Sequence, residues 1–101
     1  MLKHIVIWTL KDHAEGADKA SNLAKAKALL EACRDLVPGQ RRFEVATDAA
    51  GLGCTADLVL YSEYDDAAAL QAYQAHPTHV ALKPFLSAIV AGRQYMDFVV
   101  D

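Results

Sequence analysis

The amino-acid sequence predicts an α+β fold whose elements follow the order β-α-β-β-α-β. Two stretches carry apolar residues at helical spacing, and four shorter stretches are rich in β-branched and aromatic residues. Proline, glycine or aspartate stands at most of the boundaries between them. The chain has 101 residues, of which 53% are hydrophobic, so residues 1–101 are expected to form a single domain with a packed core.

The first predicted strand covers residues 2–10, "LKHIVIWTL". His4, Val6, Trp8 and Leu10 point to one side of this strand, because successive side chains alternate between the two faces of a sheet. Both sides carry large apolar groups, so we expect both faces of the sheet to be covered. The stretch is too short and too charged for a membrane span or a signal peptide.

After a polar loop over residues 11–18, the spacing predicts a helix over about residues 18–36, which Pro38 and Gly39 end. Strands are predicted over residues 41–48 and 56–64. In the second of them, alternation places two sets of residues on opposite faces, Asp57, Val59, Tyr61 and Glu63 on one and Leu58, Leu60, Ser62 and Tyr64 on the other.

A second helical region begins after Asp65 or Asp66, either of which suits an N-cap. Pro77 cannot continue this helix but suits the first turn of a new one. The new helix is expected to break near Pro84 and to stop at Gly92. The last strand is then predicted over residues 93–101, with Tyr95, Asp97 and Val99 on one face.

This order of elements is the ferredoxin-like arrangement, a four-stranded antiparallel sheet with its helices on one face. The first and third strands are central in this topology. The face without helices would leave a mostly apolar patch exposed in a monomer, which is rare. We therefore expect a second copy of the chain to cover it, which gives a two-fold homodimer.

Charge and cysteine content narrow the classes of partner. The net charge is −3, and Arg41–Arg42 is the only tight basic pair, so no nucleic acid partner is expected. Cys33 and Cys54 belong to no CxxC pair. They are predicted to be free thiols, and the protein is predicted to be cytoplasmic.

The stretch "LQAYQAHPTHVALKPFL", residues 70–86, carries the strongest candidate chemistry, with Tyr73, His76 and His79 spaced three apart. A histidine exchanges a proton near neutral pH, and a tyrosine hydroxyl can donate a hydrogen bond to a developing enolate oxygen. Tyr73 and His79 flank the predicted helix break, which can aim both side chains at one point. His76 is expected to meet the last free carbonyls of the first helix.

A pocket is predicted between the sheet and the second helical region. His4 would lie in a central strand beneath that region, and Asp57 would lie on the neighbouring central strand. The expected apolar walls are Val6, Trp8, Val59 and Tyr61. Such a pocket suits a small, mostly apolar ligand with a few polar groups. Each of these residues also has a purely structural interpretation, in which Trp8 fills the space and the histidines bind backbone carbonyls.

No metal or cofactor is expected. His76 and His79 are three apart across a proline, unlike the i, i+4 pair of a helical zinc site, and no cysteine cluster adds ligands. The sequence holds no nucleotide fingerprint. Neither Cys54 nor Ser87 lies in a recognisable nucleophile motif.

These residues resemble the stress-responsive dimeric α/β-barrel (Dabb) family over nearly the whole chain. The likeness rests on "KHIVIW", "LVPGQRRFEV", "ADLVLYSEYDDAAALQAYQAHPTHVALK" and "MDF", of which "AYQAHPTHV" is the most specific. The resemblance implies a ferredoxin-like protomer whose sheet packs face to face with that of a partner. A few plant members, the polyketide cyclases, close rings by aldol-type chemistry without a metal or cofactor.

In those cyclases, the tyrosine and the second histidine of this motif act as an acid–base pair, and the resemblance places them at Tyr73 and His79. A histidine of their first strand corresponds to His4. Asp57 stands where they have a histidine, which changes the charge of the pocket. The sequence is consistent with two functions. One is a cytosolic stress-responsive protein that binds a small apolar ligand, with structural histidines. The other is a cofactor-free enzyme in which His79 is the base, Tyr73 the acid, and His4 with Asp57 orient them. A cofactor-independent monooxygenase is a weaker third alternative by analogy of fold.

Overall fold

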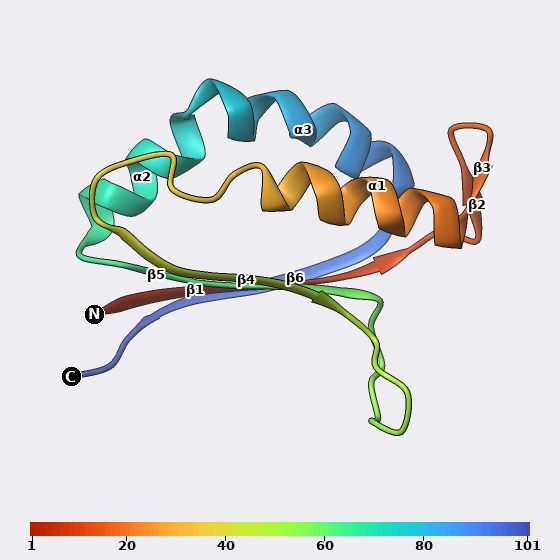
Figure 1. Ribbon diagram of the computed structural model, residues 1–101, viewed down its shortest axis with the longest axis horizontal. Coiled ribbons are helices and arrows are strands. Elements are labelled where there is room, and N and C mark those ends of the chain that lie inside the picture. Colours follow the sequence, from red (N-terminus) through yellow and green to blue (C-terminus); the bar gives the residue numbers. More distant parts are fainter.

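The computed structural model describes all 101 residues and shows a four-stranded sheet with helices on one face (Figure 1). The strands lie in the order β4 (Gln40–Thr47), β5 (Leu58–Tyr64), β1 (Leu2–Leu10) and β6 (Val90–Val99), and every neighbouring pair is antiparallel. The first strand and the third long strand are therefore central, and the fold is ferredoxin-like, as the sequence predicts.

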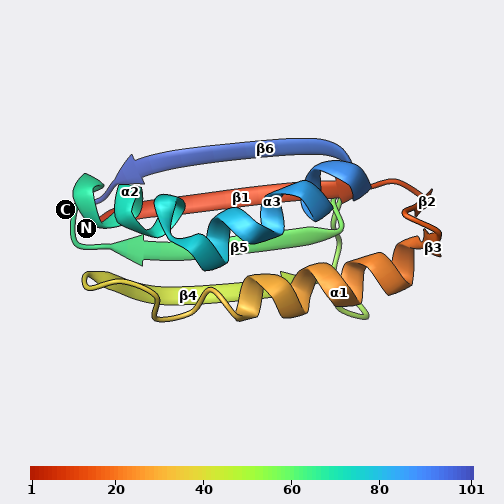
Figure 2. The ribbon, with the colours of Figure 1, turned by 90° about the horizontal axis from the view of Figure 1, so that it is seen from above.

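The helices form a single layer over the sheet. They are α1 (Lys19–Glu31), α2 (Ala67–Ala75) and α3 (Pro77–Ile89). Seen from above, α1 runs along β4 while α3 runs over β5 and β1, so that β6 has no helix above it (Figure 2). A short hairpin of β2 (His13–Ala14) and β3 (Ala17–Asp18) lies within the predicted loop. None of the three helices has the length and apolar character of a membrane-spanning segment.

The alternation of β1 has the predicted phase. His4, Val6, Trp8 and Leu10 are buried under the helices, and Ile7 on the opposite side is 37% exposed. In the single chain, the helices therefore cover only one face of the sheet. Both faces can be covered, as expected, only if a second molecule packs on the other face. The buried apolar side chains form one core between sheet and helices, which supplies most of the stability of a domain of this size.

The first helix ends at Glu31, earlier than the predicted residue 36. The side chain of Gln40, only 7% exposed, explains the difference. Its Nε2 donates to the carbonyl of Cys33 at 2.8 Å, and its Oε1 accepts from the amide of Leu36 at 2.8 Å. These bonds satisfy backbone groups that a longer helix would otherwise pair, so the chain can turn into β4 without a buried unpaired amide.

The second helical region divides as predicted, with Asp66 as N-cap and Pro77 as the first residue of α3. The predicted break at Pro84 is wrong, because α3 continues through this residue to Ile89. The carbonyl four residues earlier belongs to Val80, which is 47% exposed, so water can take the place of the missing donor. The final strand begins at Val90 rather than at residue 93.

We predict that Gly39→Ala destabilises the protein more than Gly51→Ala. Both glycines have φ of +85°, where a Cβ atom costs about 1–2 kcal/mol. At Gly39 the added Cβ would also lie 3.0 Å from the Cβ of Ala69, which belongs to α2 and has no rotamer to move to. At Gly51 it would meet nothing within 4 Å. Unfolding in urea measures both free energies, and equal losses would contradict the role of this contact.

Candidate functional site

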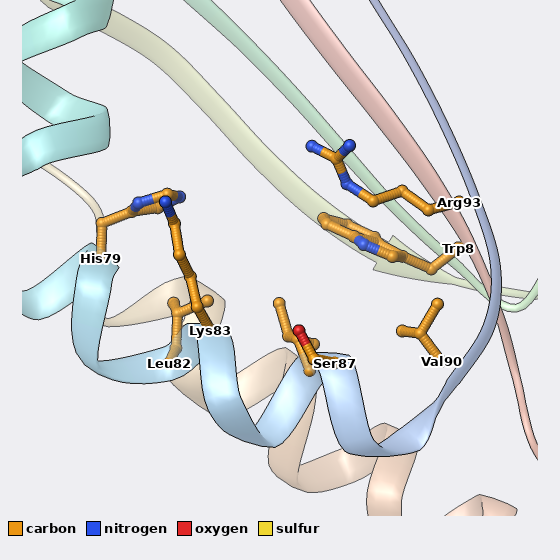
Figure 3. Close-up of a pocket in the computed structure, with 8 residues that line it drawn as sticks. Trp8, His79, Leu82, Lys83, Ser87, Val90 and Arg93 are labelled. Atoms are coloured by element: carbon orange, nitrogen blue, oxygen red, sulfur yellow. The ribbon is translucent and has the colours of Figure 1, made fainter.

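A cavity lies between α3 and the helix-covered side of β1 and β6 (Figure 3). Its outer part has a volume of about 480 Å³ and is lined by eight residues, Trp8, His79, Leu82, Lys83, Leu86, Ser87, Val90 and Arg93. Its inner part, of about 250 Å³, shares most of these residues and reaches His4, Val6 and Leu60. We call the two adjoining parts the α3 cavity. Half of the outer lining is apolar, and the other half is polar or charged.

His79 lies in the first turn of α3, and its imidazole projects into the α3 cavity (Figure 3). Its Nδ1 lies 3.0 Å from the carbonyl oxygen of Gln74. That carbonyl is free because Pro77 ends α2 and because the amide of Thr78 donates instead to Nδ1 of His76 at 3.1 Å. A carbonyl only accepts hydrogen bonds, so Nδ1 of His79 carries the proton. In the neutral ring, Nε2 is then left with its lone pair.

The surroundings of His79 favour the neutral form of its imidazole. Burial lowers the pKa of His79 below its ordinary value, and the neighbouring Lys83, His4 and Arg93 lower it further. The hydrogen bond to Gln74 acts in the opposite direction but does not outweigh burial. A neutral histidine with a free Nε2 beside a cavity is able to accept a proton near neutral pH.

Tyr73 lies on α2 beneath His79, with the two ring centroids 4.7 Å apart. It is 0% exposed, its ring also contacts Tyr64, and its hydroxyl has no hydrogen-bond partner. Burial raises the pKa of Tyr73, and the residue does not line the α3 cavity. The expected meeting of the Tyr73 hydroxyl and the His79 imidazole at one point is therefore wrong, because the tyrosine points into the core.

His76 is the N-cap of α3, where its Nδ1 accepts from the amide of Thr78. The predicted contact of the His76 ring with the last carbonyls of the preceding helix is wrong. The His76 ring meets the free N–H groups at the start of α3 instead. Like a serine or asparagine at this position, it satisfies one of the amides that have no partner inside the helix.

His4 lies on β1, buried on the helix-covered side, and lines the inner part of the α3 cavity. Its Nδ1 is hydrogen-bonded to Oδ1 of Asp97, which stands directly opposite on β6. The carboxylate fixes the orientation of the imidazole. Sequence reasoning placed Asp97 on one face of the last strand but missed this pairing, because the register of β6 against β1 decides which residue stands opposite His4.

The predicted apolar walls divide between the two faces of the sheet. Val6 and Trp8 line the α3 cavity as expected. Val59 and Tyr61 do not, because Leu58, Leu60 and Ser62 are buried under the helices and alternation turns the residues between them to the other face. The hydroxyl of Tyr61 donates to Oε2 of Glu63 at 2.6 Å on that face.

Asp57 is also separate from the α3 cavity, so its predicted role beside His4 and His79 is wrong. Its Oδ2 accepts from the amide of Leu10 at 2.8 Å and lies 3.5 Å from Nζ of Lys19. These contacts tie the start of β5 to the end of β1 and to the start of α1. The carboxylate therefore has a structural role at the opposite end of β1 from His4.

Two charged residues of the α3 cavity, Lys83 and Arg93, were missed. Both are exposed in the single chain and resemble ordinary surface charges in the sequence. A helical signal was nevertheless present, since residues 79, 82, 83 and 86 share one side of α3. No group of three or more His, Cys, Asp or Glu side chains is arranged to hold a metal ion.

Comparisons with known proteins extend along nearly the whole chain. The family model of the stress responsive A/B barrel domain matches residues 2–100. A dimeric ferredoxin-like protein of unknown function from Bacteroides fragilis is similar, with 29% identity, a TM-score of 0.81 and coverage of 98% of this chain and 95% of that one.

A Dabb family protein from Mesorhizobium loti shares 26% identity, with a TM-score of 0.66 and coverage of 98% and 95%. A structure described as an antibiotic biosynthesis monooxygenase shares 18% identity, with a TM-score of 0.72 and coverage of 100% and 99%, and shows likeness of fold alone. A search of curated proteins found no significant match. Since the family match spans almost every residue, the chain belongs to the stress responsive A/B barrel domain family.

Proposed function

We propose that this protein binds a small oxo compound in the α3 cavity and that His79 removes a proton from the carbon next to the carbonyl, without a cofactor. The observation that carries the proposal is the hydrogen bond from Nδ1 of His79 to the Gln74 carbonyl, which leaves Nε2 unprotonated beside a cavity of about 480 Å³. Cavities of about 300–1,000 Å³ are typical of sites for small ligands.

The proposed step balances within the ligand and one imidazole. Nε2 of His79 takes the proton from carbon, and the electron pair of the broken C–H bond moves onto the carbonyl oxygen to give an enolate. The cations of Lys83 and Arg93 stabilise the negative charge of the enolate more strongly than water would. Return of the proton from His79 regenerates the base, so that no second acid is required.

His4, Asp97 and Tyr73 support this centre in different ways. The Asp97 carboxylate orients the His4 imidazole at the inner end of the cavity. Tyr73 holds the His79 ring by packing against it. In this proposal Tyr73 is a positioning residue rather than the proton donor, because its hydroxyl is buried in the core.

An enolate formed in this cavity has more than one possible fate. Attack of its carbon on a second carbonyl of the same ligand would give the aldol-type ring closure of the polyketide cyclases. The monooxygenase alternative rests on shared fold alone. Without any turnover, the same cavity would serve a binding protein of the stress response. The two free thiols, Cys33 and Cys54, fit the reducing conditions of the cytoplasm, where we propose that the protein acts.

We also propose that the protein is a homodimer joined through the helix-free face of the sheet. This face carries apolar side chains from three adjacent strands, among them Ile7 at 37% exposure and Met96 at 62% exposure. Val59 and Tyr61 belong to the same face. A relative with 29% identity is described as dimeric, which supports the proposal.

His79→Asn is expected to abolish proton exchange at the carbon next to the ketone of β-benzoylpropionamide, followed by proton NMR in heavy water. The asparagine amide can still donate to the Gln74 carbonyl, so the helix junction is kept while the base is lost. His76→Asn is the matched control, because asparagine is also a good N-cap. Equal exchange rates in both variants would overturn the proposed role of His79.

The exchange rate should fall with decreasing pH, with an inflection below 6.5, the ordinary pKa of histidine. The sign follows from burial, which lowers the pKa of His79, so the neutral base persists to lower pH than in an exposed histidine. The pH profile of catalysed exchange measures this value. An inflection above 6.5 would show that another group supplies the base.

Tyr73→Phe is expected to leave the exchange rate within about twofold of wild type and to leave stability unchanged or raised. The hydroxyl that it removes has no partner, and an unpaired buried hydroxyl costs free energy. The phenylalanine ring keeps the contact with His79. A large loss of exchange at unchanged stability would instead make Tyr73 the proton donor.

Ile7→Lys is expected to convert the dimer into a monomer, because it places a charge at the centre of the proposed interface. Val80→Lys is the control, since Val80 is also exposed, at 47%, but lies on α3 above the opposite face. Sedimentation equilibrium at micromolar concentration measures the mass. A wild-type monomer, or two variants that dissociate alike, would contradict this interface.

A further inference from the structure

Lys83 and Arg93 reach the α3 cavity from two separate elements. Lys83 lies on α3, one turn after His79, and Arg93 lies on β6 opposite Trp8. Figure 3 shows the Lys83 and His79 side chains rising from the same side of α3, and the Arg93 guanidinium extending above Trp8. Two cations therefore flank a cavity whose floor includes Trp8, Leu82 and Leu86.

Neither cation has an acidic partner. All of the ion pairs of the chain involve other side chains. Arg93 contacts the ring of Tyr95, with 4.6 Å from Cζ to the centroid. Asp97 is the nearest acidic residue along β6, and its carboxylate is already bound to His4. In a chain of net charge −3, these two unpaired cations give the cavity a local excess of positive charge.

Lys83 and Arg93 are exposed in the single chain, and both line the α3 cavity together with His79. The positive charges of Lys83 and Arg93 each lower the pKa of His79. The direction of this effect agrees with the geometry, in which His79, Lys83 and Arg93 line the same cavity. An anion bound between them would reverse this effect on His79.

We propose that the α3 cavity selects small carboxylates, with the carboxylate held between Arg93 and Lys83 and the apolar body of the ligand resting on Trp8, Leu82 and Leu86. Arginine can hold both oxygens of a carboxylate with two parallel hydrogen bonds, and lysine adds a point charge. This inference rests on the proposed function, because it names the substrate class of the same cavity.

The lining favours a carboxylate over a phosphate. Phosphate sites are usually built from several free backbone N–H groups at a helix start or a glycine-rich loop. The polar groups that line the cavity are instead side chains, those of His79, Lys83, Ser87 and Arg93. Two side-chain cations above an apolar floor match one singly charged group on an apolar body.

The test compares β-benzoylpropionate with β-benzoylpropionamide, which have nearly the same size but differ in charge. Isothermal titration calorimetry should show that wild type binds the carboxylate at least about tenfold more tightly than the amide. Arg93→Gln and Lys83→Gln should each reduce this preference, and the double variant should remove it. Lys27→Gln is the control, because Lys27 is an exposed lysine of α1 outside the cavity and its loss changes the net charge equally.

Equal affinity for the two compounds, including no binding of either, would overturn the inference, as would an equal loss of preference in Lys27→Gln. Stronger competition by inorganic phosphate than by benzoate would also overturn it, because the site would then be one for phosphate. The proposed function is tested by a separate measurement, the proton exchange of the neutral compound β-benzoylpropionamide. Exchange that needs His79 without a carboxylate preference would leave the proposed function standing alone. A carboxylate preference without His79-dependent exchange would instead show a carboxylate-binding protein that does not catalyse proton removal.

Discussion

The hydrogen bond between Nδ1 of His79 and the carbonyl of Gln74 is the contact on which the candidate site depends. It exists because Pro77 has no N–H and cannot continue α2, and because His76 captures the next amide, that of Thr78. The Gln74 carbonyl would otherwise accept an intrahelical bond. One proline and one capping histidine therefore set the tautomer of a second histidine, so the spacing of "AHPTH" has a physical meaning beyond a change of helix direction.

The same junction turns His79 toward the sheet while Tyr73 turns into the core. Tyr73 contributes its ring to the packing of Phe43, Tyr64 and His79, and its hydroxyl remains without a partner. An unpaired buried hydroxyl lowers the stability of the folded protein, so a phenylalanine would be expected here on grounds of stability alone. The contrast between the two side chains shows how residues six apart in a catalytic-looking motif can belong to different environments.

Much of the fold could be predicted from the sequence, because alternation and helical spacing are local. The buried side of β1, the N-cap Asp66 and the restart at Pro77 follow from such signals. The pocket walls were harder. To place Val59 and Tyr61, one must know that Leu58 and Leu60 face the helices. A shift of one residue in this alternation exchanges the two faces of β5.

The partners of the site residues depend on long-range geometry that periodicity does not contain. Asp97 meets His4 only because of the register between β6 and β1. Asp57 was expected near His4 because both are on central strands, yet it lies at the far end, next to Leu10. Lys83 and Arg93 look like surface charges until the fold brings their two elements to one cavity.

The position of the helix layer explains why a cavity forms on this side of the sheet. Helices α1 and α3 lie over β4, β5 and β1 and leave β6 uncovered (Figure 2). Side chains of β6 that face the helix layer consequently reach open space, and they are Arg93, Tyr95 and Asp97, whereas β1 and β5 present mostly apolar side chains there, which are buried. Arg93 on the uncovered strand and Lys83 on α3 give the cavity its charged groups, and Trp8, Leu82 and Leu86 give it an apolar floor. A ligand with a charged end and an apolar body matches that division, which follows from an edge strand lying beyond the reach of the helices.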